Sequence, residues 1–223
     1  WLVMEVNQEE PFAVEAMARS YYMMQQLQQQ YAFVLPKTIE YADARGNFQT
    51  PSQAHATGAI AGSHLHVVYE NGTEVFVNRA PQGNWPVKDY LGRTVELPPS
   101  GWLVFNPKEK FYEISALVDG KRFDYVTAKE FEFLDGRGQW IERGNLGATG
   151  SVALRHKTEG ALELIDIYGN KRVAFRATGD GELTAFDAEG KSLGKVALAS
   201  PRPGWREFVP LRDGRMYVFD PNR

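Results

Sequence analysis

Short segments rich in β-branched and aromatic residues dominate the chain after Pro36 and constrain its fold more than any other feature. Turn-forming pairs such as Asn71-Gly72 and Asp119-Gly120 separate these segments. Regularly spaced short strands of this kind are typical of an antiparallel sandwich or open barrel. The first series predicts a larger β-domain over residues 37–143, built from KTIEYAD, HLHVVYE, TEVFVNR, TVELP, GWLVFN, YEISALVDG, KRFDYVT and EFEFLDG.

A second series of segments follows the glycine-rich stretch RGNLGATG, which runs from Arg143 to Gly150. Turn signals at Gly169-Asn170 and Asp213-Gly214 divide it in the same way. This series predicts a smaller β-domain over residues 144–223, formed by SVALRH, ALELIDIYG, KRVAFRA, GELTAFDAEG, KSLGKVAL, REFVPL and RMYVFD.

The stretch from Glu9 to Ala32 has the periodicity of a helix, and Pro36 ends it. Two interpretations of its apolar stripe are open: packing on the β-core of the same chain, or binding of a partner. We therefore expect a helical connector over residues 1–36, and a mainly β chain with two antiparallel β-sandwich or barrel-like domains preceded by one amphipathic α-helix. The predicted stripe comprises Ala13, Met17, Tyr21, Met24, Leu27 and Tyr31.

Composition excludes several classes of function. The 223 residues carry a formal net charge of −3 with no basic run, so neither a nucleic acid nor an anionic membrane is an expected partner. The absence of cysteine excludes disulfides and thiolate chemistry. No apolar run approaches the ~18 residues that a membrane span needs. Because the chain opens on Trp1 instead of methionine, we expect it to be processed or cut from a longer protein.

Asn71-Gly72, between two segments with alternating apolar residues, predicts a β-hairpin with a two-residue loop. Such a loop pairs Val68 with Val75 and Val67 with Phe76. Apolar side chains then lie on both faces of the hairpin at mid-strand, which is typical of a position inside the fold.

His64 and His66 point to one face of this hairpin, because side chains alternate along a strand. With Glu70 they resemble the opening of the cupin metal motif, and they are the candidate metal ligands. The glycine that closes this motif is replaced by Val77, and the segment near Ser100 lacks the further histidine that the motif needs. Solvated or core-edge histidines are the competing interpretation, and we expect no cofactor.

Catalytic motifs are absent from the sequence: there is no nucleophile elbow, P-loop or dinucleotide-binding fingerprint. Carboxylates are plentiful, but a glycosidase pair has no characteristic sequence spacing. The catalytic residues therefore stay unknown at this stage.

Trp85 lies in the predicted loop GNWPV, where its ring is a candidate to stack on a sugar or to cover the end of the sandwich core. Asn78 and Asn84 are the candidate polar groups beside it. Trp140, at the edge of a predicted domain, is a further candidate carbohydrate-binding residue.

Three of these motifs resemble the C-terminal β-region of large bacterial glycoside-hydrolase-like proteins. They are YENGTEVFVN (residues 69–78), LPPSGW (97–102) and SALVDGKRFDYV (115–126), and the resemblance covers roughly residues 10–140. In that family a catalytic (β/α) barrel precedes β-sandwich domains, and the helix AVEAMARSYYMMQQLQQQYA is similar to the connector between them.

The resemblance implies a secreted or periplasmic, carbohydrate-active parent protein in which this chain is a non-catalytic accessory region. Its partners would be the catalytic barrel domain of the same parent and a poly- or oligosaccharide. Three alternatives stay open. They are an autonomous carbohydrate-binding module, an enzyme of cupin-like or small glycosidase type, and a structural surface protein.

Overall fold

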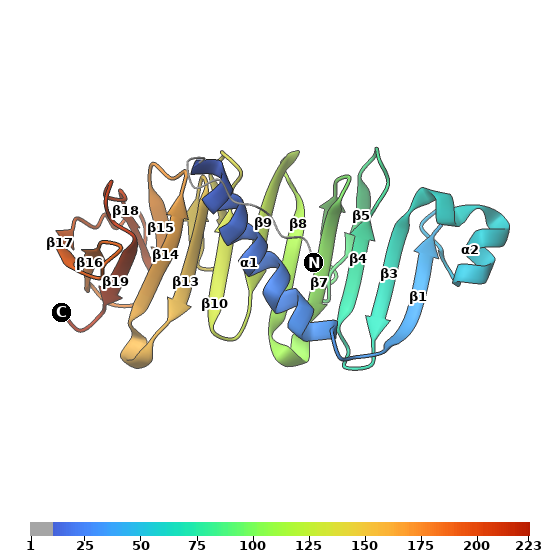
Figure 1. Ribbon diagram of the computed structural model, residues 1–223, viewed down its shortest axis with the longest axis horizontal. Helices are drawn as coiled ribbons and strands as arrows, with labels where there is room; N and C mark the ends of the chain where they lie inside the picture. The colour runs from blue at the N-terminus through green and yellow to red at the C-terminus, as the bar shows by residue number, and fades with distance from the viewer. Residues whose placement is uncertain (1–10) are drawn as a thin grey trace. The chain divides into compact units, whose positions relative to one another are not determined.

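The computed structural model describes residues 11–223, and it is mainly β, as predicted. Its strands are antiparallel throughout the described pairs, and one long helix, α1 (Pro11–Tyr31), precedes them (Figure 1). Within this range no helix is both long and apolar enough to cross a membrane. The described residues form two compact units: unit 2 is Met24–Lys129, and unit 1 contains residues 11–23 together with Glu130–Arg223.

Unit 2 is built on one sheet, in which the strand order is β2-β1-β3-β4-β7-β8-β9. Figure 1 shows the long strands of this sheet side by side. A short helix, α2 (Pro51–Thr57), follows β2 and begins with a capping box between Thr50 and Gln53. The strand bounds are β1 Pro36–Ala42, β2 Phe48–Gln49, β3 His64–Tyr69, β4 Glu74–Asn78, β7 Gly101–Asn106, β8 Phe111–Val118 and β9 Lys121–Thr127; the 3₁₀ helices are η1 Ala59–Gly62 and η2 Pro107–Glu109.

The predicted loop GNWPV is instead the start of a strand, β5 (Trp85–Lys88), which pairs with β6 (Thr94–Leu97). Trp85 and Val87 point inward from β5, whereas Pro86 is exposed, as an edge strand tolerates. Ring contacts from Trp85 to Phe76 of β4 place this hairpin against one face of the sheet.

Buried Asn78 holds the β5–β6 hairpin to the end of β4. Its Nδ2 donates hydrogen bonds to the carbonyls of Gly83 (3.0 Å) and Leu97 (2.9 Å). Its Oδ1 accepts a hydrogen bond from the backbone N–H of Ala80 at 3.1 Å. The side chain therefore satisfies backbone groups on both sides of the hairpin.

The predicted register of the β3–β4 hairpin is wrong by one residue. Val67 lies opposite Val75, and His66 lies opposite Phe76. A two-residue type I′ loop needs positive φ at both central residues, but Gly72 has φ +87° while Asn71 does not have positive φ. The side chain of Asn71 instead accepts a hydrogen bond from the N–H of Thr73, and the loop takes one further residue. His66 and Phe76 consequently share a face of the sheet.

Unit 1 contains two sheets, consistent with a sandwich. One has the order β10-β13-β14-β19-β16-β17 and the other β11-β12-β15-β18. Phe175 of the second sheet packs edge-on against Phe219 of the first at 5.4 Å, so aromatic side chains fill the space between the sheets. The bounds are β10 Phe131–Asp135, β11 Ile141–Arg143, β12 Leu146–Ala148, β13 Ser151–His156, η3 Thr158–Gly160, β14 Leu162–Tyr168, β15 Val173–Arg176, β16 Glu182–Phe186, β17 Ser192–Val196, β18 Trp205–Phe208 and β19 Met216–Asp220.

Helix α1 buries only part of the predicted stripe: Leu27 is buried as predicted, and Ala13 lies outside the residues whose side chains are described. Met17, Tyr21 and Met24 are exposed, whereas Tyr22 and Met23 are buried. In unit 1 the ring of Tyr22 stacks on Phe133 at 4.8 Å, and its hydroxyl donates a hydrogen bond to Asp166. The neighbouring Tyr21 is an equally apolar residue in the helical pattern, but its ring is exposed, whereas the Tyr22 hydroxyl reaches Asp166.

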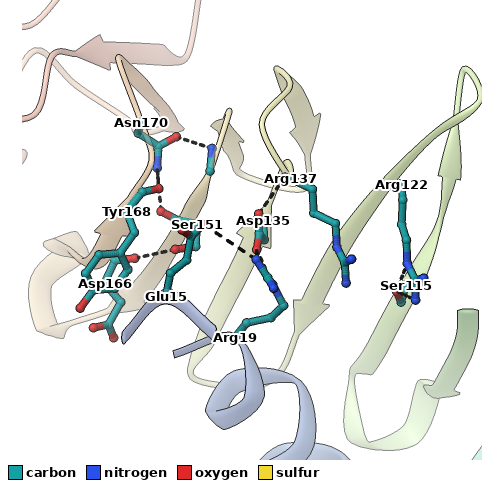
Figure 2. Close-up of polar contacts among 11 residues, drawn as sticks. Glu15, Arg19, Ser115, Arg122, Asp135, Arg137, Ser151, Asp166, Tyr168 and Asn170 are labelled. Atoms are coloured by element: carbon teal, nitrogen blue, oxygen red, sulfur yellow. Dashed lines mark hydrogen bonds and ion pairs between the residues drawn. The ribbon is translucent and has the colours of Figure 1, made fainter. Parts of the chain in front are cut away.

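An ion pair fixes the same stretch of helix to unit 1. Arg19 contacts the buried carboxylate of Asp135 at 2.5 Å, and Asp135 also accepts a hydrogen bond from the N–H of Arg137 (Figure 2). Next to it, Asn170 bonds the backbone of Ser151 and Tyr168 and fixes the loop after β14. The pKa of Glu15 is raised, mainly because the carboxyl group is partly buried and also because the negative charge of Asp135 lies nearby. These contacts fix the N-terminal part of α1 on the strands of unit 1.

Candidate functional site

Unit 2 contains a cavity of about 780 Å³ beside the β5–β6 hairpin, here called the aromatic cavity. Five aromatic side chains line it, and they come from β2, β4, β5, β7 and the β5–β6 turn. The sheet supplies one wall and the hairpin another. The lining residues are Gly46, Phe48, Gly72, Glu74, Phe76, Trp85, Pro86, Val87, Lys88, Asp89, Tyr90, Thr94, Phe105 and Pro107.

Two of these aromatic side chains remain open to solvent. Phe48 is 44% exposed and Tyr90 is 46% exposed, whereas Phe76 and Phe105 are buried. Phe48 lies 6.4 Å from Phe76, and Tyr90 lies 5.5 Å from Phe105, between ring centroids. The buried rings therefore form a floor, and the exposed rings form two sides of the opening.

A hydrogen-bonded turn positions Tyr90. The buried carboxylate of Asp89 accepts hydrogen bonds from the backbone N–H groups of Leu91 and Arg93, and it forms an ion pair with Arg93 at 2.7 Å. Burial alone would raise the pKa of Asp89, but the bonds from Arg93 and Leu91 hold it below the ordinary value. Gly92 takes a φ of +76°, which favours glycine at this position. Tyr90 is therefore presented from a rigid turn.

The same arrangement of aspartate and glycine occurs at two other hairpins. Asp43 accepts hydrogen bonds from the N–H groups of Arg45 and Asn47, and Asp187 accepts them from Glu189 and Lys191. The first of these turns precedes Phe48 in the chain. Aspartates of this pattern therefore order backbone, and their carboxylates are occupied by local N–H groups.

A histidine between two carboxylates supports the cavity from the sheet. His66 Nε2 lies 2.8 Å from Glu74 Oε1, and His66 Nδ1 lies 3.0 Å from Glu40 Oε2. The His66 ring also stacks on Phe76 at 4.3 Å. The contacts orient Glu74, whose side chain is about one-third exposed, at the edge of the aromatic cavity. Lys88 adds a second polar group there, through a 2.6 Å hydrogen bond to Thr94.

The structure brings the predicted residue Trp85 into this cavity as part of its floor. The indole is buried, and it stacks on His64 at 4.7 Å with the two rings almost parallel. Asn78 is buried, and its side chain forms the hydrogen bonds with backbone groups that hold the β5–β6 hairpin. Asn84 is exposed and donates a hydrogen bond to Glu96 at 2.8 Å. Trp140 belongs to unit 1, where the Arg172 guanidinium lies 4.1 Å from its ring.

The three predicted metal ligands lie in different surroundings. His66 faces Glu40 and Glu74, whereas Glu70 lies exposed at the end of the β3–β4 hairpin. Burial beneath the indole lowers the pKa of His64, and a hydrogen bond with Asn78 opposes that shift. Over residues 11–223, no three histidine, aspartate or glutamate side chains are grouped in a way that holds a metal ion.

A buried glutamate lies on the other face of the unit 2 sheet. Glu113 accepts a 2.6 Å hydrogen bond from the indole N–H of Trp102. Burial is the main cause that raises the pKa of Glu113 well above the ordinary value, and the nearby Asp124 raises it further. Glu113 was not recognisable from the sequence, because it alternates with apolar residues in a segment that has the pattern of a buried strand.

Sequence reasoning also missed Phe48, Tyr90 and Glu74 as parts of one site. Each lies in a different segment, and only the folding of the β5–β6 hairpin onto the sheet brings them together. The signal in the sequence was the pattern Asp89-Tyr90-Leu91-Gly92, which places an aromatic residue in a tight turn.

Chemically, the aromatic cavity offers apolar ring faces beside a few fixed polar groups. Cavities of this composition bind small organic ligands by burying apolar surface and orienting them through the polar groups. We found no protein-family model, curated protein or solved structure that matches this chain.

Proposed function

We propose that the chain is a non-catalytic accessory β-region of a carbohydrate-active protein, and that unit 2 contacts a saccharide through the aromatic cavity. The observation that carries this proposal is the pair of exposed rings, Phe48 and Tyr90, above a floor of buried aromatic side chains. Exposed aromatic side chains on rigid β-structure are costly to leave in water, and their position beside a cavity favours a ligand that covers them.

A saccharide fits the chemistry of this cavity. Sugar rings have apolar C–H faces that pack on aromatic rings, and hydroxyl groups that need hydrogen-bond partners at the edge. Phe48 and Tyr90 supply the ring faces, while Glu74 and Lys88 supply an acceptor and a donor. The volume of about 780 Å³ falls within the roughly 300–1,000 Å³ typical of ligand pockets.

The parent protein is the second part of the proposal. The motifs that resemble glycoside-hydrolase-like proteins form the β3–β4 hairpin, the turn between β6 and β7, and the β8–β9 hairpin. These are parts of the sheet that carries the aromatic cavity. A catalytic barrel domain of the same parent is therefore the proposed partner, and a secreted or periplasmic protein is the proposed setting.

Two alanine variants test the contact with saccharide. Tyr90→Ala and Phe48→Ala each remove an exposed ring, and we expect each to weaken binding about tenfold, from the loss of ~1–1.5 kcal/mol of aromatic contact. The measurement is a glycan array with the wild-type chain, followed by calorimetric titration of the saccharides that bind. Phe33→Ala is the matched control, because Phe33 is 102% exposed and does not line the cavity.

Absence of saccharide binding by the wild-type chain contradicts the proposed contact, as does equal weakening by Phe33→Ala. The parent is tested separately by the reading frame upstream of Trp1. A frame that encodes no catalytic domain overturns the accessory role, and an autonomous carbohydrate-binding module then explains binding at the aromatic cavity.

A further inference from the structure

Unit 1 contains its own cavity of about 1,010 Å³, lined by residues of both of its sheets and of the loops beside them. Arg143 ends β11, Arg176 ends β15, and Arg202 lies in the loop before β18. All three line the cavity, and Glu142 is the one carboxylate in its lining. We call it the arginine cavity.

Trp205 organises two of these arginines. The indole is buried at the start of β18, directly opposite Arg176 in the register of β15 and β18. The Arg202 guanidinium lies 4.4 Å from the Trp205 ring and that of Arg176 lies 5.2 Å from it. Cation–π contacts of this kind hold a guanidinium in place without using its N–H donors. The N–H donors of Arg176 therefore stay available to a ligand.

The two arginines differ in their carboxylate contacts. Arg202 forms an ion pair with Glu142, which also accepts a hydrogen bond from the indole N–H of Trp140. Although burial opposes the shift, these two contacts lower the pKa of Glu142 and keep it charged. Among the described residues, no carboxylate forms an ion pair with Arg176, and Trp205 is the aromatic ring beside its guanidinium.

The lining of the arginine cavity has more basic than acidic side chains, whereas the whole chain has more acidic ones. Among the described residues the cavity lining contains three arginines and one glutamate, whereas the chain has a formal net charge of −3. Like charges that gather around a concave surface attract a counter-charge and raise its local concentration. The guanidinium of Arg176, held at the Trp205 ring, is suited to the two oxygens of a carboxylate or sulfate.

We propose that the arginine cavity binds an oxyanion, a carboxylate or sulfate group, with Arg176 as its main contact. The group has two sources: an acidic saccharide that carries it, or a free inorganic anion. The site lies in unit 1 and uses none of the residues of the aromatic cavity, so it stands independently of the proposed contact with saccharide.

Calorimetric titration of the full chain at low salt tests this site. The probes are tetragalacturonate, a heparin-derived tetrasaccharide, inorganic sulfate and phosphate, with cellotetraose as the neutral counterpart. The variants are Arg176→Gln, which removes the charge, and Arg176→Lys, which keeps the charge but loses the planar donor pair. Arg212→Gln is the matched control, because Arg212 is exposed in unit 1 and does not line the cavity.

We expect an anionic probe to bind the wild-type chain. Its affinity for Arg176→Gln should be lower by a factor of about ten or more, and its affinity for Arg176→Lys should lie between the two. Binding of the acidic tetrasaccharides but not of the inorganic anions identifies a saccharide as the source, and the reverse identifies a free anion. The proposal is overturned if no anionic probe binds, if Arg176→Gln weakens binding of cellotetraose as much as binding of the anionic probe, or if Arg212→Gln weakens anion binding as much as Arg176→Gln does. Tyr90→Ala leaves this binding unchanged, which separates the outcome from that of the aromatic cavity.

Discussion

Replacement of Asn78 by alanine tests whether one buried side chain fixes the β5–β6 hairpin on the sheet. The substitution removes three hydrogen bonds with backbone groups, to the carbonyls of Gly83 and Leu97 and from the N–H of Ala80, as well as the side-chain hydrogen bond with His64. The bond to Leu97 is fully buried, so its loss leaves an unsatisfied carbonyl and costs about 1–3 kcal/mol. The other two bonds are partly buried, and water replaces them at a net cost of about 0.5–1 kcal/mol each.

Asn78→Ala is therefore expected to lower the free energy of unfolding by about 2–5 kcal/mol. The measurement is urea denaturation followed by tryptophan fluorescence, at a single protein concentration. Asn84→Ala is the matched control, because Asn84 is exposed and makes a single hydrogen bond, to Glu96, so the expected change is within about 0.5 kcal/mol.

The hairpin carries Tyr90, so Asn78→Ala is also expected to weaken saccharide binding at the aromatic cavity. Equal loss of stability in Asn78→Ala and Asn84→Ala would show that the buried amide does not fix the hairpin. A folded Asn78→Ala variant with an unchanged near-UV circular dichroism spectrum would lead to the same conclusion.

Three further substitutions follow from the geometry. Burial raises the pKa of Glu113, so its protonation stabilises the fold at acidic pH, and this contribution is lost as the pH rises through the folded pKa. Glu113→Gln still accepts the hydrogen bond from Trp102 and should be more stable than the wild type at neutral pH. Urea denaturation at acidic and at neutral pH measures the difference. Trp85→Ala should cost about 3–5 kcal/mol in the same assay, because the ring is buried. Tyr22→Phe should cost about 1–3 kcal/mol, because it leaves Asp166 without the hydroxyl, and an unchanged midpoint would contradict that contact.

The strands of this fold were predictable, because alternation and turn residues are local properties of the sequence. The predicted segments from KTIEYAD to RMYVFD correspond to strands, and α1 lies where the helical periodicity placed it. The strand β5 was missed because Pro86 and the surrounding small polar residues are typical of a loop. Only its edge position makes a strand acceptable there.

Register and packing faces were not predictable, because they depend on distant contacts. Asn71-Gly72 suits more than one hairpin loop, and Asn71 also donates a hydrogen bond to the carbonyl of Gln30, far away in sequence. The paired residues Tyr21-Tyr22 and Met23-Met24 give the helix two apolar stripes of similar strength. The contacts of Tyr22 with Phe133 and Asp166 determine which of the two stripes is buried.

The candidate site was predictable only in part. Trp85 was recognised as an aromatic residue beside a turn, and it does line the aromatic cavity. Its partners Phe48 and Tyr90 come from segments about forty residues apart, and they share a site only after the hairpin folds over the sheet. The arginine cavity likewise depends on tertiary structure. The pairing of β15 with β18 brings Arg176 to Trp205, and Arg202 in the loop before β18 contacts the same ring.

The most direct measurement of the central claim is chemical-shift mapping of the isotope-labelled chain with the saccharide that binds most tightly on the array. We expect the largest changes at Phe48, Tyr90 and Thr94, around the opening of the aromatic cavity, and no change at Phe33. Changes that cluster elsewhere in unit 2, or a saturating saccharide that leaves Phe48 and Tyr90 unchanged, would contradict it.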